Sequence, residues 1–61
     1  MFFQMIFSIK AYWYLVLASL LFSIEKYETA VKFSNLALQA NSNFDKAWYA
    51  RGEALKKLER Y

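Results

Sequence analysis

The sequence predicts an all-α protein made of short antiparallel helices, and three observations lead to this prediction. The 61 residues include no proline and a single glycine, so few positions interrupt a helix. Apolar residues recur at spacings of three and four, which is the period of an α-helix rather than of a strand. The pattern of residues 12–27 also returns thirty-four residues later, at 46–61, and such a repeat is typical of stacked helical units.

The composition disfavours an enzyme and a metal protein. Cysteine and histidine are both absent, which removes disulfides, thiolate ligands and the commonest general base. The five carboxylates are spread along charged segments, with no apolar pocket that would raise a carboxyl pKa. We therefore expect no catalytic activity and no metal or other cofactor.

The charges are distributed unevenly along the chain. Lys10 is the only charged residue in positions 1–24, and the other charges, of both signs, lie between Glu25 and Arg60. The net charge of +3 therefore comes from mixed, solvated helix faces rather than from a basic stripe. We expect no nucleic-acid partner.

The apolar N-terminal segment, residues 1–10, has three interpretations. It could begin a signal peptide or membrane anchor, form a buried packing helix, or end a preceding repeat. A secretory signal carries positive charge before its apolar run, whereas Lys10 comes after it.

A helix is predicted over residues 11–24, which carry no charge. A bilayer-spanning helix needs about 20 apolar residues, so these fourteen are too few alone. Residues 1–24 together are long enough, but Lys10 then lies in the middle, where a charge costs roughly 2.5–3.5 kcal/mol on insertion scales. Two alternatives follow: membrane association through residues 1–24, or a core helix buried on most sides.

The rest of the chain predicts a turn, a helix, a loop and a last helix. Three charges in residues 25–28 mark the turn, and residues 28–40 form the second helix. Residues 41–44 are the clearest loop, because Asn and Ser side chains compete for backbone hydrogen bonds. Asn43 is the expected N-cap of a helix over 45–60, which carries Trp48, Gly52, Leu55 and Leu58 on one stripe.

The internal repeat resembles the tetratricopeptide repeat (TPR) family. Tyr14 aligns with Trp48, Ala18 with Gly52, and Leu21 with Leu55, at a period of thirty-four residues with two helices per period. The resemblance implies one full repeat over residues 11–44 and the first helix of a second over 45–61. The expected fold is thus an antiparallel helix-turn-helix α-solenoid fragment of about one and a half repeats.

The resemblance also implies which residues pack the helices together. These repeat-packing positions are Tyr14, Ala18, Leu21, Tyr27, Ala30, Ala37, Trp48, Gly52, Leu55 and Tyr61. Three positions depart from the family pattern: Arg51 replaces a leucine, Ser34 a bulky residue and Ser42 the closing proline.

A TPR-like fold implies a protein-interaction scaffold that binds a peptide or partner helix through its concave face. By register, the inward positions are Tyr12, Leu15, Val16, Ser19 and Phe22 on the first helix, and Lys46, Tyr49, Ala50, Glu53 and Lys56 on the last. One half is apolar and the other mixed in charge, which suits a peptide with an apolar part and an acidic part. A cytoplasmic location goes with this function.

The alternative is a small membrane-associated protein with residues 1–24 in or on the bilayer. In addition, repeat arrays need about three repeats with polar ends for stability. We therefore expect the chain to self-associate, to bind a partner through its apolar faces, or to be a piece of a longer repeat protein.

Overall fold

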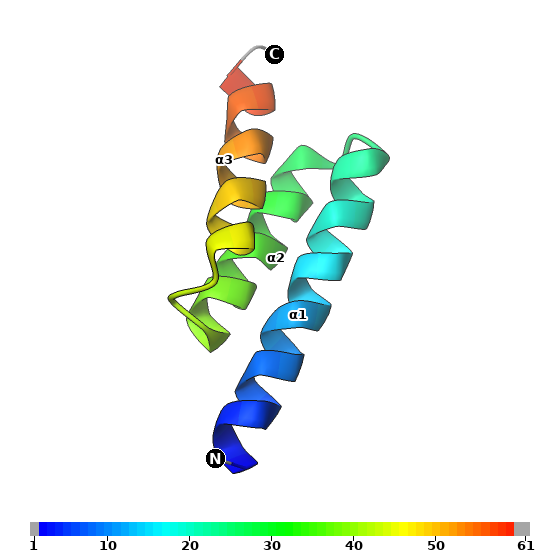
Figure 1. The fold of residues 1–61 in the computed structure, drawn as a ribbon. Coiled ribbons are helices and arrows are strands. Elements are labelled where there is room, and N and C mark those ends of the chain that lie inside the picture. Colours follow the sequence, from blue (N-terminus) through cyan, green and yellow to red (C-terminus); the bar gives the residue numbers. More distant parts are fainter. Residues whose placement is uncertain (1, 60–61) are drawn as a thin grey trace.

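Three α-helices make up the fold. The computed structural model describes residues 2–59, and the side chains of residues 9–59. Helix α1 spans Phe2–Ser23, α2 spans Tyr27–Ala40 and α3 spans Asp45–Glu59. Consecutive helices run antiparallel, with α1 and α3 both packed on α2 (Figure 1). The predicted all-α class is therefore confirmed, and the packing is consistent with a fragment of a helical repeat.

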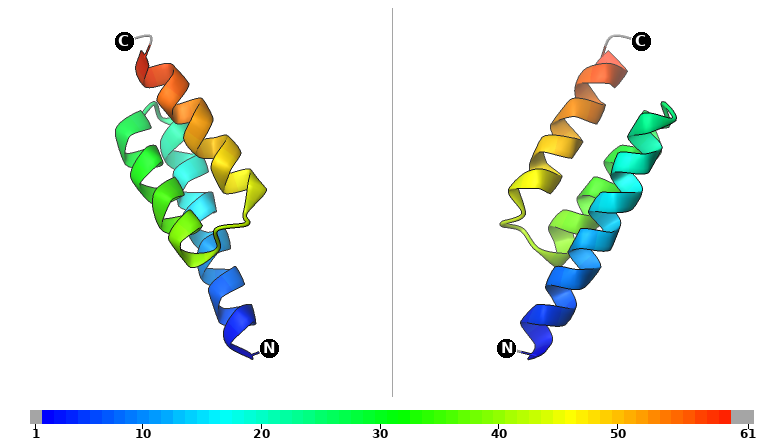
Figure 2. Two further views of the ribbon diagram at one scale, coloured as in Figure 1. Left: turned by 90° about the vertical axis from the view of Figure 1, so that its left-hand side faces the viewer. Right: turned by 45° about the vertical axis from the view of Figure 1, so that its right-hand side comes forward.

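The helix boundaries lie close to those expected from the sequence, except at the N-terminus. Helix α1 is continuous through residues 2–10 and passes Lys10 without interruption. Its N-terminal end projects beyond the ends of α2 and α3 (Figure 2). Within the described residues, none of the helices combines the length and apolarity needed to cross a bilayer.

The α1–α2 turn is a Schellman motif, the commonest way to end a helix. The Lys26 amide donates to the Leu21 carbonyl oxygen at 2.8 Å, and the Glu25 amide donates to the Phe22 carbonyl oxygen at 3.0 Å. Glu25 has a φ of 65°, the left-handed conformation that the motif requires and that glycine usually provides. The turn folds α2 back along α1.

The core is a seam of small side chains along the facing sides of the three helices. The buried apolar residues are Ala11, Leu15, Ala18, Ala30, Ala37, Ala47 and Ala54, of which the alanines are at most 1% exposed. Methyl side chains allow helix axes to approach closely. Ser34 belongs to this seam as well, and its hydroxyl is satisfied by donating to the Ala30 carbonyl oxygen at 2.9 Å.

Larger side chains flank the seam and connect α1 to α2. The Tyr14 and Phe33 rings lie 6.2 Å apart, and the Phe22 and Tyr27 rings make an edge contact at 5.2 Å. Leu21, also on α1, is half-buried. The expected packing positions of the first repeat therefore lie at or beside the α1–α2 contact.

Helix α3 packs through a different stripe from the one expected. Ala47 and Ala54 are its buried residues, whereas Trp48 is 51% exposed and Leu55 is half-buried. A Cβ atom added to Gly52 would meet nothing within 4 Å. Trp48 and Gly52 therefore make no close helix contact among the described residues, because α3 turns its alanines toward α2, and the packing role expected for them stays a prediction. Tyr61, also expected to pack, lies outside the described residues.

The N-cap of α3 is Phe44 rather than Asn43. The Phe44 carbonyl oxygen accepts from the amides of Ala47 and Trp48, at 3.0 and 3.2 Å, so the helical hydrogen bonds begin there. The Asn43 amide instead donates to Oδ1 of Asn41 at 3.1 Å. The prediction for Asn43 failed because Asn41 forms the local side-chain turn that organises this loop.

Candidate protein-binding groove

A groove runs between α1 and α3 on the side of the bundle away from α2. Its volume is about 480 Å³. Both walls are helical, with four lining residues from each helix. The residues are Leu15, Ser19, Phe22 and Ser23 from α1, and Lys46, Tyr49, Ala50 and Glu53 from α3.

The groove exists because α1 and α3 contact α2 more extensively than they contact each other. The alanine seam sets the spacing of each helix from α2, and their remaining sides diverge. Leu15 forms the floor: it is buried together with Ala37 and Ala47, and Ala50 packs against this cluster. The floor is therefore part of the core, which fixes its position without a ligand.

The two walls differ in chemistry. The α1 wall carries apolar and hydroxyl side chains and no charge. The hydroxyl of Ser23 donates to the carbonyl oxygen of Ser19 at 3.1 Å, so part of its hydrogen-bonding capacity is used within the helix. Phe22 is held by its edge contact with Tyr27.

The α3 wall carries the groove's two charges. Lys46 is exposed and Glu53 is half-buried. They are seven residues apart, which is two helical turns or about 10 Å along the axis. Tyr49 lies between them in sequence and is 71% exposed, so its ring is available to a ligand. The wall therefore presents a cation, an aromatic ring and a carboxylate in order.

Seven of the ten inward positions expected from the sequence line this groove. Of the other three, Tyr12 is exposed, Val16 is half-buried and Lys56 is exposed, and none of them is a lining residue. The sequence reasoning missed Ser23. Its position one helical turn after Ser19 would have indicated it, since residues four apart share a helix face.

The groove is lined mostly by apolar groups, with a few polar groups among them. Apolar lining with a few placed polar groups is the usual character of a recognition site. Across the described residues, no cluster of three carboxylates could hold a metal ion.

Comparison of the chain with protein-family models, curated proteins and solved structures found no match.

Proposed function

We propose that this chain is a protein-interaction module of TPR type that binds a short peptide or partner helix in the groove between α1 and α3. One observation carries the proposal. Residues that the internal repeat assigns to the concave face come from two helices and line one continuous groove.

The lining chemistry defines the preferred ligand. Leu15, Phe22 and Ala50 offer an apolar surface, which favours one or two aliphatic or aromatic side chains of the ligand. Lys46 favours an acidic group at the same end of the ligand. Glu53 disfavours acidic groups two turns further along α3. The ligand is therefore apolar in one part and acidic in the part near Lys46.

The test is selection of peptides on the 61-residue chain, followed by measured affinities. Random 12-residue peptides displayed on phage are selected against the immobilised chain, and enriched sequences are synthesised with a fluorescent label. Fluorescence anisotropy then gives the dissociation constant. We expect the enriched peptides to combine apolar and acidic residues.

Matched variants locate the binding surface. Lys46→Glu reverses a groove charge and should weaken the selected peptides by about tenfold or more, since the lost attraction becomes repulsion. Lys56→Glu makes the same change on the same helix outside the groove and should change the affinity by less than about twofold. Peptides that bind both variants equally, or a failure to enrich any peptide, would exclude the groove as the binding site.

A further inference from the structure

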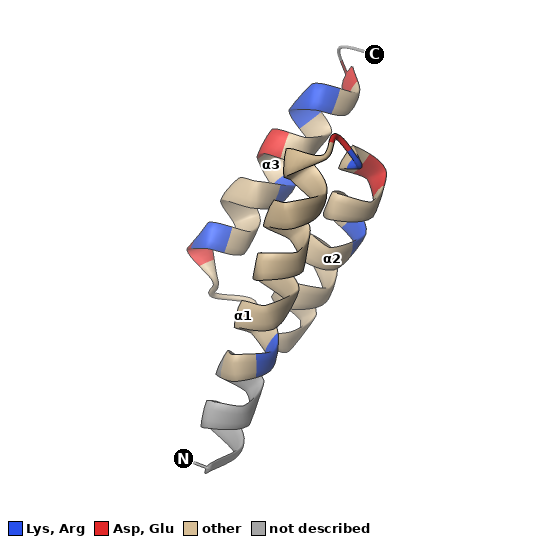
Figure 3. Ribbon diagram, turned by 90° about the vertical axis from the view of Figure 1, so that its right-hand side faces the viewer, with Lys and Arg blue, Asp and Glu red and all other residues tan. Residues whose placement is uncertain are grey.

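A second surface lies opposite the core, along the outer face of α1 and the first residue after it. Ile9, Trp13, Leu17, Leu20 and Ile24 form this surface, here named the outer stripe, and they are 41–64% exposed. Figure 3 presents α1 toward the viewer and shows no acidic or basic residue over most of the described part of this helix. Large apolar side chains gathered on one exposed face mark interaction sites more often than isolated ones do.

The outer stripe carries larger side chains than the helix contacts inside the chain, as a comparison of equivalent positions in the internal repeat shows. Thirty-four residues separate Trp13 from Ala47 and Leu20 from Ala54. Both alanines are fully buried against the rest of the bundle, whereas Trp13 and Leu20 are about 60% exposed. A surface with a tryptophan and a leucine at these positions does not suit the close helix approach that the alanines permit. It suits interdigitation with another bulky surface.

The residues of the outer stripe are spaced almost symmetrically about its midpoint. Its outermost residues, Ile9 and Ile24, are equally far from a point between positions 16 and 17, and so are Trp13 and Leu20. Leu17 lies next to that point. When two copies of α1 pack antiparallel about it, each Ile9 faces Ile24 and each Trp13 faces Leu20 of the other copy. A surface of this kind is self-complementary, as a two-fold symmetric interface requires.

The shape of the surface agrees with this register. A shallow hollow of about 420 Å³ is lined by Ile9, Lys10, Trp13, Tyr14 and Leu17. Its centre is level with Trp13, where the antiparallel register places Leu20 of the second copy. Two-fold symmetry repeats the contact, so two leucines enter two hollows.

The charges favour the antiparallel orientation by a small amount. Lys10 borders one end of the outer stripe, and Glu25, followed by Lys26, borders the other. A parallel pair places the two Lys10 ammonium groups side by side. An antiparallel pair separates them by about 20 Å along the axis and brings each near Glu25 of the other copy.

The exposed area of the outer stripe reaches the minimum that a weak dimer needs. Five side chains of 41–64% exposure leave on the order of 500 Å² of apolar surface per copy. Two copies that cover all of this surface bury at most about 1,000 Å² in total, which is the lower limit for a specific interface and less than the roughly 1,200–2,000 Å² of stable ones. A specific interface also has a polar rim around its apolar centre, and the charged residues Lys10 and Glu25 lie at the two ends of the outer stripe.

We propose that the outer stripe is the interface of a symmetric dimer in which two copies of α1 pack antiparallel. The inference does not depend on the groove, which lies on another side of α1. The two proposals can therefore fail separately. A bilayer surface is the competing occupant of the outer stripe, and the test distinguishes the two.

The first measurement is sedimentation equilibrium of the full chain over a range of concentrations in detergent-free buffer. We expect a reversible monomer–dimer equilibrium. Leu20→Glu places two carboxylates in the interface and should raise the dimer dissociation constant by about a hundredfold or more. Tyr49→Glu, a matched change at an exposed groove residue, should leave dimerisation unchanged. A chain that stays monomeric, or a dimer lost only in Tyr49→Glu, would overturn the proposal.

The second measurement reports the orientation and does not depend on how the charged variants fold. The chain has no cysteine, so a single introduced thiol is unique. A short bis-maleimide should cross-link Ile9→Cys to Ile24→Cys in a mixture, and should not cross-link Ile9→Cys to itself. Self-linking of Ile9→Cys would indicate a parallel pair and contradict the proposal. Co-flotation of the wild type with phosphatidylcholine vesicles, without any dimer in buffer, would assign the outer stripe to lipid instead.

Discussion

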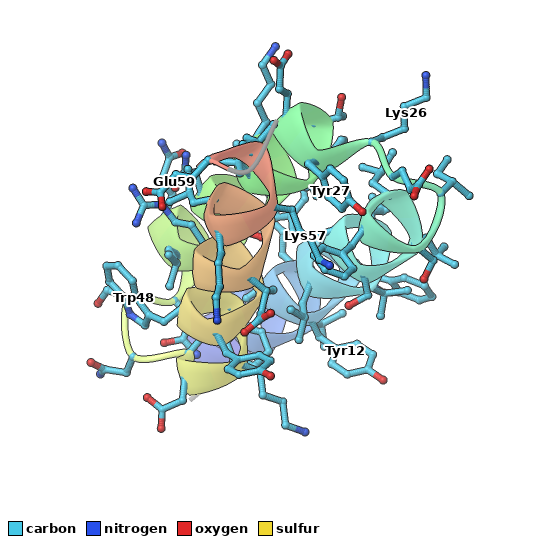
Figure 4. All side chains as sticks on the ribbon, turned by 90° about the horizontal axis from the view of Figure 1, so that it is seen from above. Tyr12, Lys26, Tyr27, Trp48, Lys57 and Glu59 are labelled. Carbon is cyan, nitrogen blue, oxygen red and sulfur yellow. The ribbon has the colours of Figure 1, made fainter. Side chains whose placement is uncertain are left out.

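The indole Nε1 of Trp48 donates a hydrogen bond to the carbonyl oxygen of Ser42 at 2.9 Å. This contact ties the first turn of α3 to the loop that precedes it. Figure 4 shows Trp48 on the side of α3 that faces away from α1. The guanidinium carbon of Arg51 lies 5.9 Å from the centre of the indole ring and limits the positions open to the ring. An exposed tryptophan thus stabilises the loop over residues 41–44.

Trp48→Phe should lower the free energy of unfolding by about 0.5–1.5 kcal/mol, the usual net value of one hydrogen bond. The substitution keeps an aromatic ring beside Arg51 and removes the N–H donor together with the five-membered ring that carries it. Urea unfolding followed by circular dichroism measures the change at one fixed chain concentration. Tyr49→Phe, which removes a hydroxyl from the neighbouring exposed ring, is the control and should have almost no effect. Equal values for the two variants would show that the Trp48–Ser42 hydrogen bond contributes nothing.

Gly52→Ala should stabilise the protein. The added methyl group meets open space, and alanine is favoured over glycine inside a helix by about 0.8–1.0 kcal/mol. A close helix contact at this position would give the opposite sign, because the methyl group would then clash. Thermal unfolding of the two proteins side by side distinguishes these results: a higher midpoint is expected for Gly52→Ala, and a lower midpoint would mean that another helix covers Gly52.

Glu25→Gly should also stabilise the fold. A residue with a side chain in the left-handed conformation costs roughly 1 kcal/mol, and glycine has no such cost. Its greater freedom in the unfolded chain offsets part of the gain. We expect a net increase of about 0.5 kcal/mol in the free energy of unfolding.

Lys26→Gly is the matched control for that turn. Lys26 has a φ of −88°, which any residue adopts easily, so glycine only adds freedom to the unfolded state. The control should therefore be less stable than the wild type. If the two glycine variants have equal midpoints in urea, the left-handed strain at Glu25 is negligible.

The sequence was sufficient to predict the number of helices, the loops and most of the groove. The elements follow from local signals: charges interrupt the apolar pattern at residues 25–28, and Asn and Ser cluster at 41–44. The groove residues follow from the resemblance to the TPR family, which implies that the first helix of each repeat lines the concave face, and the period of thirty-four residues then gives the matching positions on α1 and α3.

The orientation of α3 about its own axis could not be predicted from the same signals. Trp48 and Ala47 are neighbours, and the larger residue is the natural candidate for the core. In α1, the equivalent residue Tyr14 packs against Phe33 of the helix that follows. No described helix follows α3, so the equivalent surface around Trp48 stays exposed, and the methyl groups of Ala47 and Ala54 make the contact with α2.

Each helix packs mainly on its neighbour in the sequence, and this affects how the chain folds. Most contacts join α1 to α2 and α2 to α3, so they close short stretches of chain. Folds of low contact order form in microseconds to milliseconds. The contact between α1 and α2 is the most extensive of the three, so we expect this hairpin to form first and α3 to add to a surface that is already in place.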